Sequence, residues 1–301
     1  MAQVQSNNRE ITSYCPEVSF GTLGSPANFT EIPKVNNSLQ LNKEIIDSAV
    51  LSSDRSENWS RHGNYDISGT IQGELGHSYW DDFIAASVGG TWTANVLQNG
   101  DVAQYFAIHR GFLGLDTPQH FVFSGCAINR TSYAVNNRGI VSVSFDVIGA
   151  SVDEDTSPPD ASIAAYGDFV PFTHIGSALK VGGSTIATGT SLTWEYGNNI
   201  EMLRGIGSPA GFAAPLGEFN ASGTLVSYFT SLAEYNVFKN EAETEIEITL
   251  TDGTNTMKFE WPRVKFNSAR IPNGGGSGQI MATIDWHALK DGFVTKITRS
   301  A

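Results

Sequence analysis

The sequence predicts a mainly β protein that contains two tandem copies of one domain. Glycine is abundant, with 31 residues, and Ser, Thr and Val are frequent, which is typical of many short strands joined by turns. Ile67–Ile71 (Ile-Ser-Gly-Thr-Ile) recurs 154 residues later as Ala221–Leu225 (Ala-Ser-Gly-Thr-Leu), and Ser38–Leu41 matches Ser191–Trp194 at an offset of 153. A repeat of this length is the size of a domain, not of a solenoid unit.

Length, composition and charge limit the classes of protein to which the chain can belong. A chain of 301 residues with 40% hydrophobic residues can bury two cores of ordinary size. Its net charge of −13 argues against a surface that binds nucleic acid by neutralising phosphates. Cys15 and Cys126 are too few for a disulfide framework, so we expect buried or idle thiols. Neither a signal-peptide pattern nor a run of about 18 apolar residues occurs, so we expect a cytoplasmic product without a membrane span.

The first copy is predicted over residues 29–150, after a polar, extended N-terminal arm of residues 1–28. Residues 42–64 are mostly polar, and a loop of this length in a compact domain is usually disordered or functional. Residues 65–75 then alternate between polar side chains and apolar residues or glycine, which predicts a half-buried strand. A short helix is predicted from residue 78 to 90, where Gly89 and Gly90 end it.

The second copy is predicted over residues 168–301. An acidic linker with a Pro-Pro pair, residues 151–167, separates it from the first copy. The second copy carries a long insertion at 197–217, and residues 273–278 (Asn-Gly-Gly-Gly-Ser-Gly) predict a flexible hairpin tip.

Further strands follow the helix in each copy. We expect them at residues 102–109 and 120–124 in the first copy, and at 245–250 and 257–261 in the second, where Thr251–Asn255 has good hairpin-turn chemistry. The helix of the second copy is expected to begin at a capping box of Ser231 and Glu234 and to bury an apolar stripe of Leu232, Tyr235 and Phe238.

The last strand of each copy places an acid and a short hydroxyl on its polar face. Asp146 and Ser144 alternate with apolar residues in the first copy, and Asp285 and Thr283 do so in the second. Glu74 occupies the polar face of the strand at 65–75. Alternation shows which residues of a strand share a face, but it leaves open whether that face points outward or into a cavity.

No catalytic or metal-binding motif stands out. The six histidines are scattered without the spacing of a metal site, and the acidic clusters lack the spaced ligands of a calcium loop. The sequence has neither G-x-S-x-G, nor a P-loop, nor a strand-linked G-x-G-x-x-G. We therefore predict no cofactor, no metal and no enzymatic activity.

The order of several motifs resembles the major tail tube proteins of tailed bacteriophages, from about Phe29 to Leu289. The first copy carries this resemblance at Ile67–Thr70, Ser78–Trp92, His109–Phe112, Phe123–Cys126 with Asn129, and Val143–Phe145 with Gly149; the second carries it at Ser222–Thr224, Leu250–Asp252 and Trp261–Lys265.

The resemblance implies two tandem β-sandwich or half-barrel domains, each with a flanking helix and long loops. It implies a structural virion protein whose rings stack into a tube with one continuous inner β-barrel. Rings of this family generally have six-fold symmetry, so a duplicated chain would form homotrimers with pseudo-six-fold symmetry. The implied partners are other copies of the chain, the tape measure protein, the tail terminator and the distal tail or initiator proteins. The implied location is the virion tail, assembled in the cytoplasm of a bacterial host.

An acidic lumen would let DNA pass without binding it. We hypothesise that Asp146, Asp285, Glu74, Ser144 and Thr283 face this lumen, although the outer surface is the alternative for each. Two other functions stay open. One is the inner tube of a contractile tail, a tailocin or a secretion apparatus. The other is a carbohydrate-binding tail module, which needs a concave aromatic cluster, whereas the tryptophans are predicted in the core: Trp80, Trp92, Trp194, Trp261 and Trp286.

Overall fold

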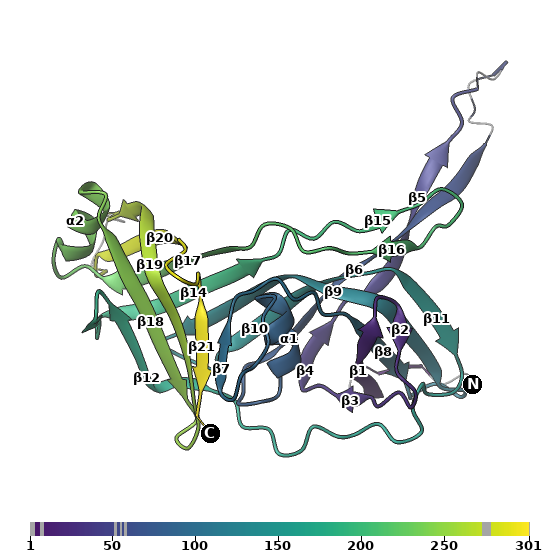
Figure 1. The fold of residues 1–301 in the computed structure, drawn as a ribbon, viewed down its shortest axis with the longest axis horizontal. Helices are drawn as coiled ribbons and strands as arrows, with labels where there is room; N and C mark the ends of the chain where they lie inside the picture. Colours follow the sequence, from purple (N-terminus) through teal and green to yellow (C-terminus); the bar gives the residue numbers. More distant parts are fainter. Residues whose placement is uncertain are drawn as a thin grey trace.

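The computed structural model describes residues 4–6, 9–50, 53–54, 56, 59–272 and 278–300. Within these residues the protein is mainly β, with two short helices, α1 (Asp81–Ser87) and α2 (Ala233–Lys239). Nineteen strands form a large antiparallel sheet folded as a β-sandwich, not as a closed barrel, and two more form a separate small sheet (Figure 1). The mainly β fold class is confirmed. Neither helix of the described chain is long and apolar enough to cross a membrane.

The strands vary from two to 18 residues in length. In chain order they are β1 (Glu10–Ser19), β2 (Thr22–Leu23), β3 (Thr30–Glu31), β4 (Lys34–Asn37), β5 (Gln40–Asp47), β6 (Ser60–Glu74), β7 (Val96–Gln98), β8 (Phe106–Phe112), β9 (Gln119–Asn136), β10 (Ser142–Gly149), β11 (Ser151–Asp155), β12 (Thr173–Val181), β13 (Ser184–Thr185), β14 (Gly189–Gly197), β15 (Leu203–Arg204), β16 (Gly211–Ala213), β17 (Asn220–Tyr228), β18 (Glu243–Thr251), β19 (Thr256–Arg270), β20 (Met281–Ala288) and β21 (Lys296–Arg299).

A central sheet of eight strands runs through both halves of the chain, in the order β5-β6-β10-β9-β14-β17-β20-β19. The pairing of β9 with β14 joins the two halves, so the sheet is continuous across them. β5 and β19 form its two edges, at opposite ends of the molecule (Figure 1).

Each half completes a sandwich with an outer sheet. The first part of β9 pairs with β8 and β11, and β8 pairs with β1. The first part of β19 likewise pairs with β18 and β21, and β18 pairs with β12. Both long strands therefore bend from the outer sheet into the central one, and the apolar faces of the two sheets enclose the core.

The order of elements is the same in both halves. β1, β5, β6, α1, β8, β9, β10 and β11 correspond in pairing to β12, β14, β17, α2, β18, β19, β20 and β21. This correspondence supports the expected duplication. One detail of the sequence match is wrong: Gln40 lies opposite Ser68 and Glu195 opposite Ser222, so Gln40 corresponds to Glu195 at an offset of 155, not 153.

The glycine of the repeated Ser-Gly-Thr motif allows two strands to approach closely. A Cβ atom at Gly69 would lie 2.4 Å from the Cα atom of Leu39. At the equivalent position, a Cβ atom at Gly223 would lie 2.4 Å from the carbonyl oxygen of Thr193 and 2.5 Å from the ring of Trp286. A side chain at Gly69 would have to displace the backbone of the neighbouring strand, and one at Gly223 would have to displace both backbone and the core residue Trp286.

Gly223→Ala should therefore lower the free energy of unfolding by about 1–3 kcal/mol, as overpacking of a close-packed interior does. Chemical denaturation of the wild type and the variant measures the difference. The control is Gly278→Ala, because nothing lies within 4 Å of a Cβ atom built there. Equal unfolding midpoints for Gly223→Ala and the wild type would show that the strands can separate without cost.

The tryptophans predicted in the core are there, with one exception. Trp80, Trp194, Trp261 and Trp286 are each at most 1% exposed, whereas Trp92 is half-buried against the same cluster. In the first half Trp80 packs on Phe145 with ring centroids 5.1 Å apart. Cys15 and Cys126 are buried free thiols, as expected.

The two helices differ in burial, and one prediction for the second is wrong. Five of the seven residues of α1 are buried, but none of α2 is. Leu232 and Tyr235, predicted in the core, are exposed, and Leu232 is 54% exposed. The helices also begin later than predicted, at Asp81 and Ala233. Their N-cap residues, Trp80 and Leu232, make no side-chain cap hydrogen bond, but the predicted cap Ser231 does accept from the N–H of Ala233 at 3.2 Å.

The predicted extended arm is wrong for residues 10–19, which form β1: residues 10–16 pair with β8, and Glu17 and Ser19 pair with β2. The segment appeared polar because residues buried on both of its faces are hydroxyls with hydrogen-bond partners inside the fold. The hydroxyl of Ser13 lies 2.9 Å from Nδ1 of His109, and Asn37 donates to the hydroxyl of Thr12 at 3.2 Å. Residues 151–155 of the predicted linker likewise form β11 beside β9.

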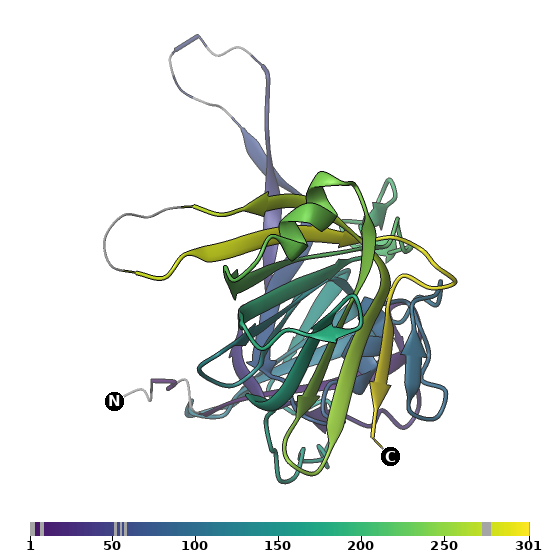
Figure 2. The ribbon, with the colours of Figure 1, turned by 90° about the vertical axis from the view of Figure 1, so that its left-hand side faces the viewer.

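The polar segment predicted as a loop at 42–64 is largely a hairpin. β5 and β6 stay paired as far as Asp47 and Ser60, and the hairpin projects from the body of the molecule (Figures 1 and 2). Both faces of its outer part are exposed, so no apolar alternation marks it in the sequence. The insertion at 197–217 contains the smaller β15–β16 hairpin. Most of the tip predicted at 273–278 lies outside the described residues.

A pair of buried histidines in the outer sheet of the first half makes stability depend on pH. Nε2 of His109 lies 2.8 Å from Nδ1 of His120. Burial, together with the neighbouring His120, lowers the pKa of His109 from 6.5 to about 4. The unfolded chain therefore takes up this proton first, so stability is lost as pH falls from about 6.5 towards 4.

We expect this loss to be on the order of 2–3 kcal/mol. His109→Gln removes the titrating group, so the difference in unfolding free energy between wild type and variant should shrink as pH falls through this window. Denaturation series at pH 7 and pH 4 measure it. A difference that stays constant would mean that His109 is not held neutral in the folded protein.

Candidate functional site

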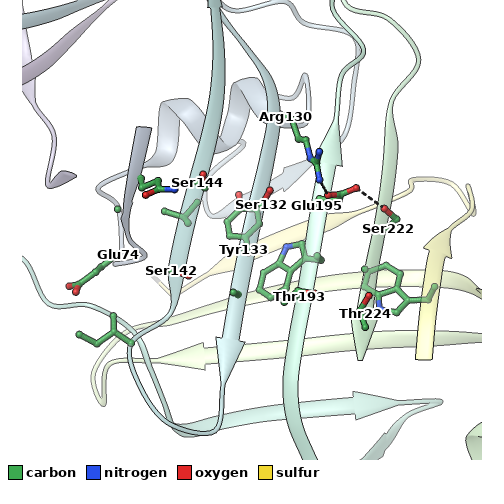
Figure 3. A pocket seen from close by; sticks show the side chains of 18 of the residues that line it. Glu74, Arg130, Ser132, Tyr133, Ser142, Ser144, Thr193, Glu195, Ser222 and Thr224 are labelled. Atoms are coloured by element: carbon green, nitrogen blue, oxygen red, sulfur yellow. Dashed lines mark hydrogen bonds and ion pairs between the residues drawn. The ribbon is translucent and has the colours of Figure 1, made fainter. Parts of the chain in front are cut away.

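The most extensive polar feature is one face of the central sheet. Side chains that alternate with the core residues of β6, β10, β9, β14, β17 and β20 form a hollow of about 860 Å³ on this face (Figure 3). Arg130 is the one cation among its charged and hydroxyl-bearing described residues. The others on this face carry hydroxyls or carboxylates: Glu74, Ser132, Ser142, Ser144, Thr193, Glu195, Ser222, Thr224 and Asp285. No histidine or cysteine is among the described residues that line it.

The five residues selected from the sequence all belong to this sheet. Glu74 lies opposite Ser142, Ser144 opposite Gln72 and Asp146 opposite Thr70, on β6 and β10. In the second half, Thr283 lies opposite Val226 and Asp285 opposite Thr224, on β20 and β17. Glu74, Ser144 and Asp285 line the hollow, whereas Asp146 and Thr283 lie farther along the same strands.

The threonine of the repeated Ser-Gly-Thr motif bonds the acid of the neighbouring strand in both halves. The Thr70 hydroxyl donates to Oδ1 of Asp146 at 3.0 Å, and the Thr224 hydroxyl donates to Oδ1 of Asp285 at 2.9 Å. The Thr–Asp pair is thus duplicated in structure as well as in sequence. Such cross-strand pairs hold the register of neighbouring strands.

Asp285 has further partners that stabilise its charge. The hydroxyl of Ser268 donates to Oδ2 at 2.7 Å, and Arg270 donates to the same oxygen at 2.6 Å. The hydrogen bond from Ser268, with those from Thr224 and Arg270 and the positive charge of Arg270, lowers the pKa of Asp285 below its usual value. This carboxylate therefore stays ionised at neutral and mildly acidic pH.

The centre of the face lies on β9 and β14 and was not predicted from the sequence. There Arg130 forms an ion pair with Glu195, and the Ser222 hydroxyl donates to Glu195 at 3.4 Å (Figure 3). A signal existed, because Thr131, Tyr133 and Val135 alternate with Arg130, Ser132, Ala134 and Asn136, of which all but Ala134 are polar. Only the pairing of β9 with β14, however, places Arg130 beside Glu195. The face carries carboxylates at Glu74, Asp146, Glu195 and Asp285 against guanidinium groups at Arg130 and Arg270.

This arrangement offers an extended polar surface, not an enclosed site for a small molecule. In the part of the chain that the structure describes, no group of three or more His, Cys, Asp or Glu side chains could hold a metal ion. The hollow spans strands of both halves. A mainly β protein with a broad sheet surface and two open sheet edges is suited to assembly with further copies.

Comparison with known proteins agrees with a mainly β protein that assembles with further copies of itself. The sequence model of the phage tail tube protein family matches residues 7–288, so the chain belongs to that family. No curated protein matches the chain significantly. The chain is accordingly a structural component of the phage virion tail that assembles with itself into the tube.

Proposed function

We propose that three copies of the chain form each ring of the tube and that the polar face of the central sheet lines the lumen. The observation that carries this proposal is the continuous run of eight strands with an open edge at each end. A sheet removes its edges by closing on itself, and strands supplied by several identical chains can do this with cyclic symmetry. Two equivalent halves per chain and three chains per ring give the pseudo-six-fold symmetry that the family implies.

The charge of the polar face supports the passage of DNA. Double-stranded DNA carries one negative charge per roughly 1.7 Å of its axis, and each phosphate that a protein neutralises strengthens binding. The carboxylates of this face outnumber its guanidinium groups, and Arg130 and Arg270 are engaged with Glu195 and Asp285. A lumen of hydroxyls and carboxylates would therefore let phosphates slide without binding them.

The remaining roles that we propose are those implied by the resemblance to tail tube proteins. Rings would stack head to tail, with the projecting β5–β6 hairpin reaching a neighbouring ring. The tube would enclose the tape measure protein during assembly in the host cytoplasm and would meet the tail terminator and the distal tail or initiator proteins at its ends. We propose the same chain organisation for the inner tube of a contractile tail, and a sheath protein on the purified tube would identify that variant. A carbohydrate-binding module has less support because Trp80, Trp194, Trp261 and Trp286 are buried.

Negative-stain microscopy of the purified protein at rising concentration, with averaging of end-on views, tests the proposal. We expect hollow rings or tubes with three chains and six similar units per turn, and native mass spectrometry of the rings should give three chains. Compact monomers at every concentration, even with tail-initiator proteins added, would overturn it.

A further inference from the structure

The junction between the two halves shows how two units of this fold join. β9 and β14 pair with Ser132 opposite Glu195 and with Thr131 opposite Tyr196. On the core side of the junction, Tyr133 of β9 inserts among aromatic residues of the second half. Its ring lies 4.9 Å from Trp194, 5.3 Å from Phe259 and 5.8 Å from Tyr196, measured between centroids.

Strand pairing identifies the residues at the open edges that correspond to this junction. Gln40 takes the place of Glu195 because each lies opposite the serine of the Ser-Gly-Thr motif. Arg270 takes the place of Ser132, because Arg270 lies opposite Thr283 on β20 and Ser132 lies opposite Ser144 on β10. By the same pairing Leu41 corresponds to Tyr196 and Ala269 to Thr131, and the residue after Arg270, Ile271, corresponds to Tyr133.

The edge of the first half contains an open cavity where the junction contains Tyr133. Leu39, Leu41 and Phe121 correspond to Trp194, Tyr196 and Phe259, the three residues that pack around Tyr133. Together with Phe112, Phe123 and Val152 they line a cavity of about 330 Å³ beside β5. This cavity is apolar apart from Gln40, Arg110 and Glu154 on its lining.

Residues at the open edges are less buried than their equivalents at the junction, as expected if a neighbouring strand is missing at each edge. Tyr196 and Thr131 are fully buried, whereas their equivalents Leu41 and Ala269 are only half-buried although both face the core. α1 lies in the middle of the molecule, where Asn198 of the second half donates to the carbonyl of Ala86 at 3.1 Å (Figure 1). α2 lies at one end and has no buried residue.

We propose that β19 of one chain pairs with β5 of a second copy in the register of the internal junction, and that Ile271 enters the cavity beside Leu39, Leu41 and Phe121. Arg270 then lies opposite Gln40, Ala269 opposite Leu41, and Ser268 opposite Asn42. Arg270 and Gln40 are on the polar face, and Ala269 and Leu41 are on the core face, so the register continues both faces of the sheet around the ring. The inference rests on the proposed ring and specifies its contact.

Cysteine cross-linking tests the register. Residues directly opposite in an antiparallel pair have Cα atoms close enough for a disulfide, whereas diagonal neighbours are generally too far apart. In Gln40→Cys/Arg270→Cys the two cysteines are at opposite edges of one chain, so they can join only two different chains. We expect oxidation of assembled rings to convert most of the protein into covalent trimers on non-reducing gels. Ser132→Cys/Glu195→Cys is the matched positive control, because it places the same pair of positions at the internal junction.

The off-register pair Gln40→Cys/Ser268→Cys is the matched negative control, and we expect at least tenfold slower cross-linking from it. Rings that form without cross-linking of Gln40→Cys/Arg270→Cys, or that cross-link faster through the off-register pair, would overturn the register but leave the ring intact. A protein that forms no rings, although the internal control pair cross-links within the chain, would overturn the proposed function and this contact with it.

Discussion

Tubes in which Asp146 and Asp285 are both replaced by lysine should assemble but eject DNA much more slowly than wild-type tubes. With three chains per ring, the two substitutions replace about six carboxylates with about six cations in every ring. A protein that makes six to ten phosphate contacts loses affinity for DNA by about 10³–10⁵ between 50 and 200 mM salt, which shows how strongly such contacts hold DNA. We expect the ejection rate to fall on the order of tenfold or more, and to recover as salt screens the contacts.

The matched control is Asp146→Asn/Asp285→Asn, which keeps side-chain size and the ability to accept from Thr70 and Thr224. It removes the negative charge without adding a cation, so ejection should stay near the wild-type rate. Microscopy must first show tubes of normal diameter for both variants, because Asp285 also bonds Ser268 and Arg270. Fluorescence of a DNA-binding dye outside triggered virions measures the rate. Equal, salt-independent rates for all three proteins would place these acids outside the lumen.

Ile271→Asp should abolish ring formation while the monomer stays folded. In the proposed contact, the new carboxylate would enter a mostly apolar cavity beside Leu39, Leu41 and Phe121. Arg110 on the lining is already paired with Glu10, and burial of an unpaired charge costs several kcal/mol. A penalty of about 3 kcal/mol per contact corresponds to a more than hundredfold higher concentration for assembly. Ile271 follows the last residue of an edge strand, so its substitution leaves the core of the isolated chain intact.

Ile175→Asp is the matched control, because Ile175 is 72% exposed on β12, in the outer sheet and away from both edges of the central sheet. It makes the same chemical change and should leave the assembly concentration unchanged. Light scattering against concentration measures assembly, and circular dichroism shows whether each monomer is folded. Normal assembly of Ile271→Asp would mean that the cavity receives something other than this residue.

The strands with one buried face were predictable, and those without one were not. Residues 65–75 alternate between core and polar face, and β6 occupies them. β1 escaped prediction because its buried Thr12 and Ser13 are polar and are satisfied by Asn37 and His109, which are distant in sequence. The outer part of the β5–β6 hairpin escaped because both of its faces are exposed. Local periodicity detects burial of one face, and it fails where hydrogen bonding between distant residues replaces it.

The candidate site shows the same division. Asp146 and Asp285 could be found because each belongs to an alternating pattern that occurs in both copies. The structure places each beside the threonine of the repeated motif. Arg130 and Glu195 could not be found as a pair, because 65 residues separate them and no local pattern shows which strands are neighbours. Their ion pair makes the middle of the face less acidic than the sequence suggested.

The amino-acid sequence by itself determined that the chain is mainly β, that a short strand motif recurs in it, and which side chains of each strand share a face. These properties depend on spacing along the chain, and a period of two residues is a direct consequence of strand geometry. Only the tertiary structure decided that β9 pairs with β14, which joins the two halves into one sheet with two open edges. It also decided that residues of α1 are buried whereas those of α2 are not. Strand pairing depends on the fit of whole surfaces that are distant in sequence, so it appears only when the chain is folded.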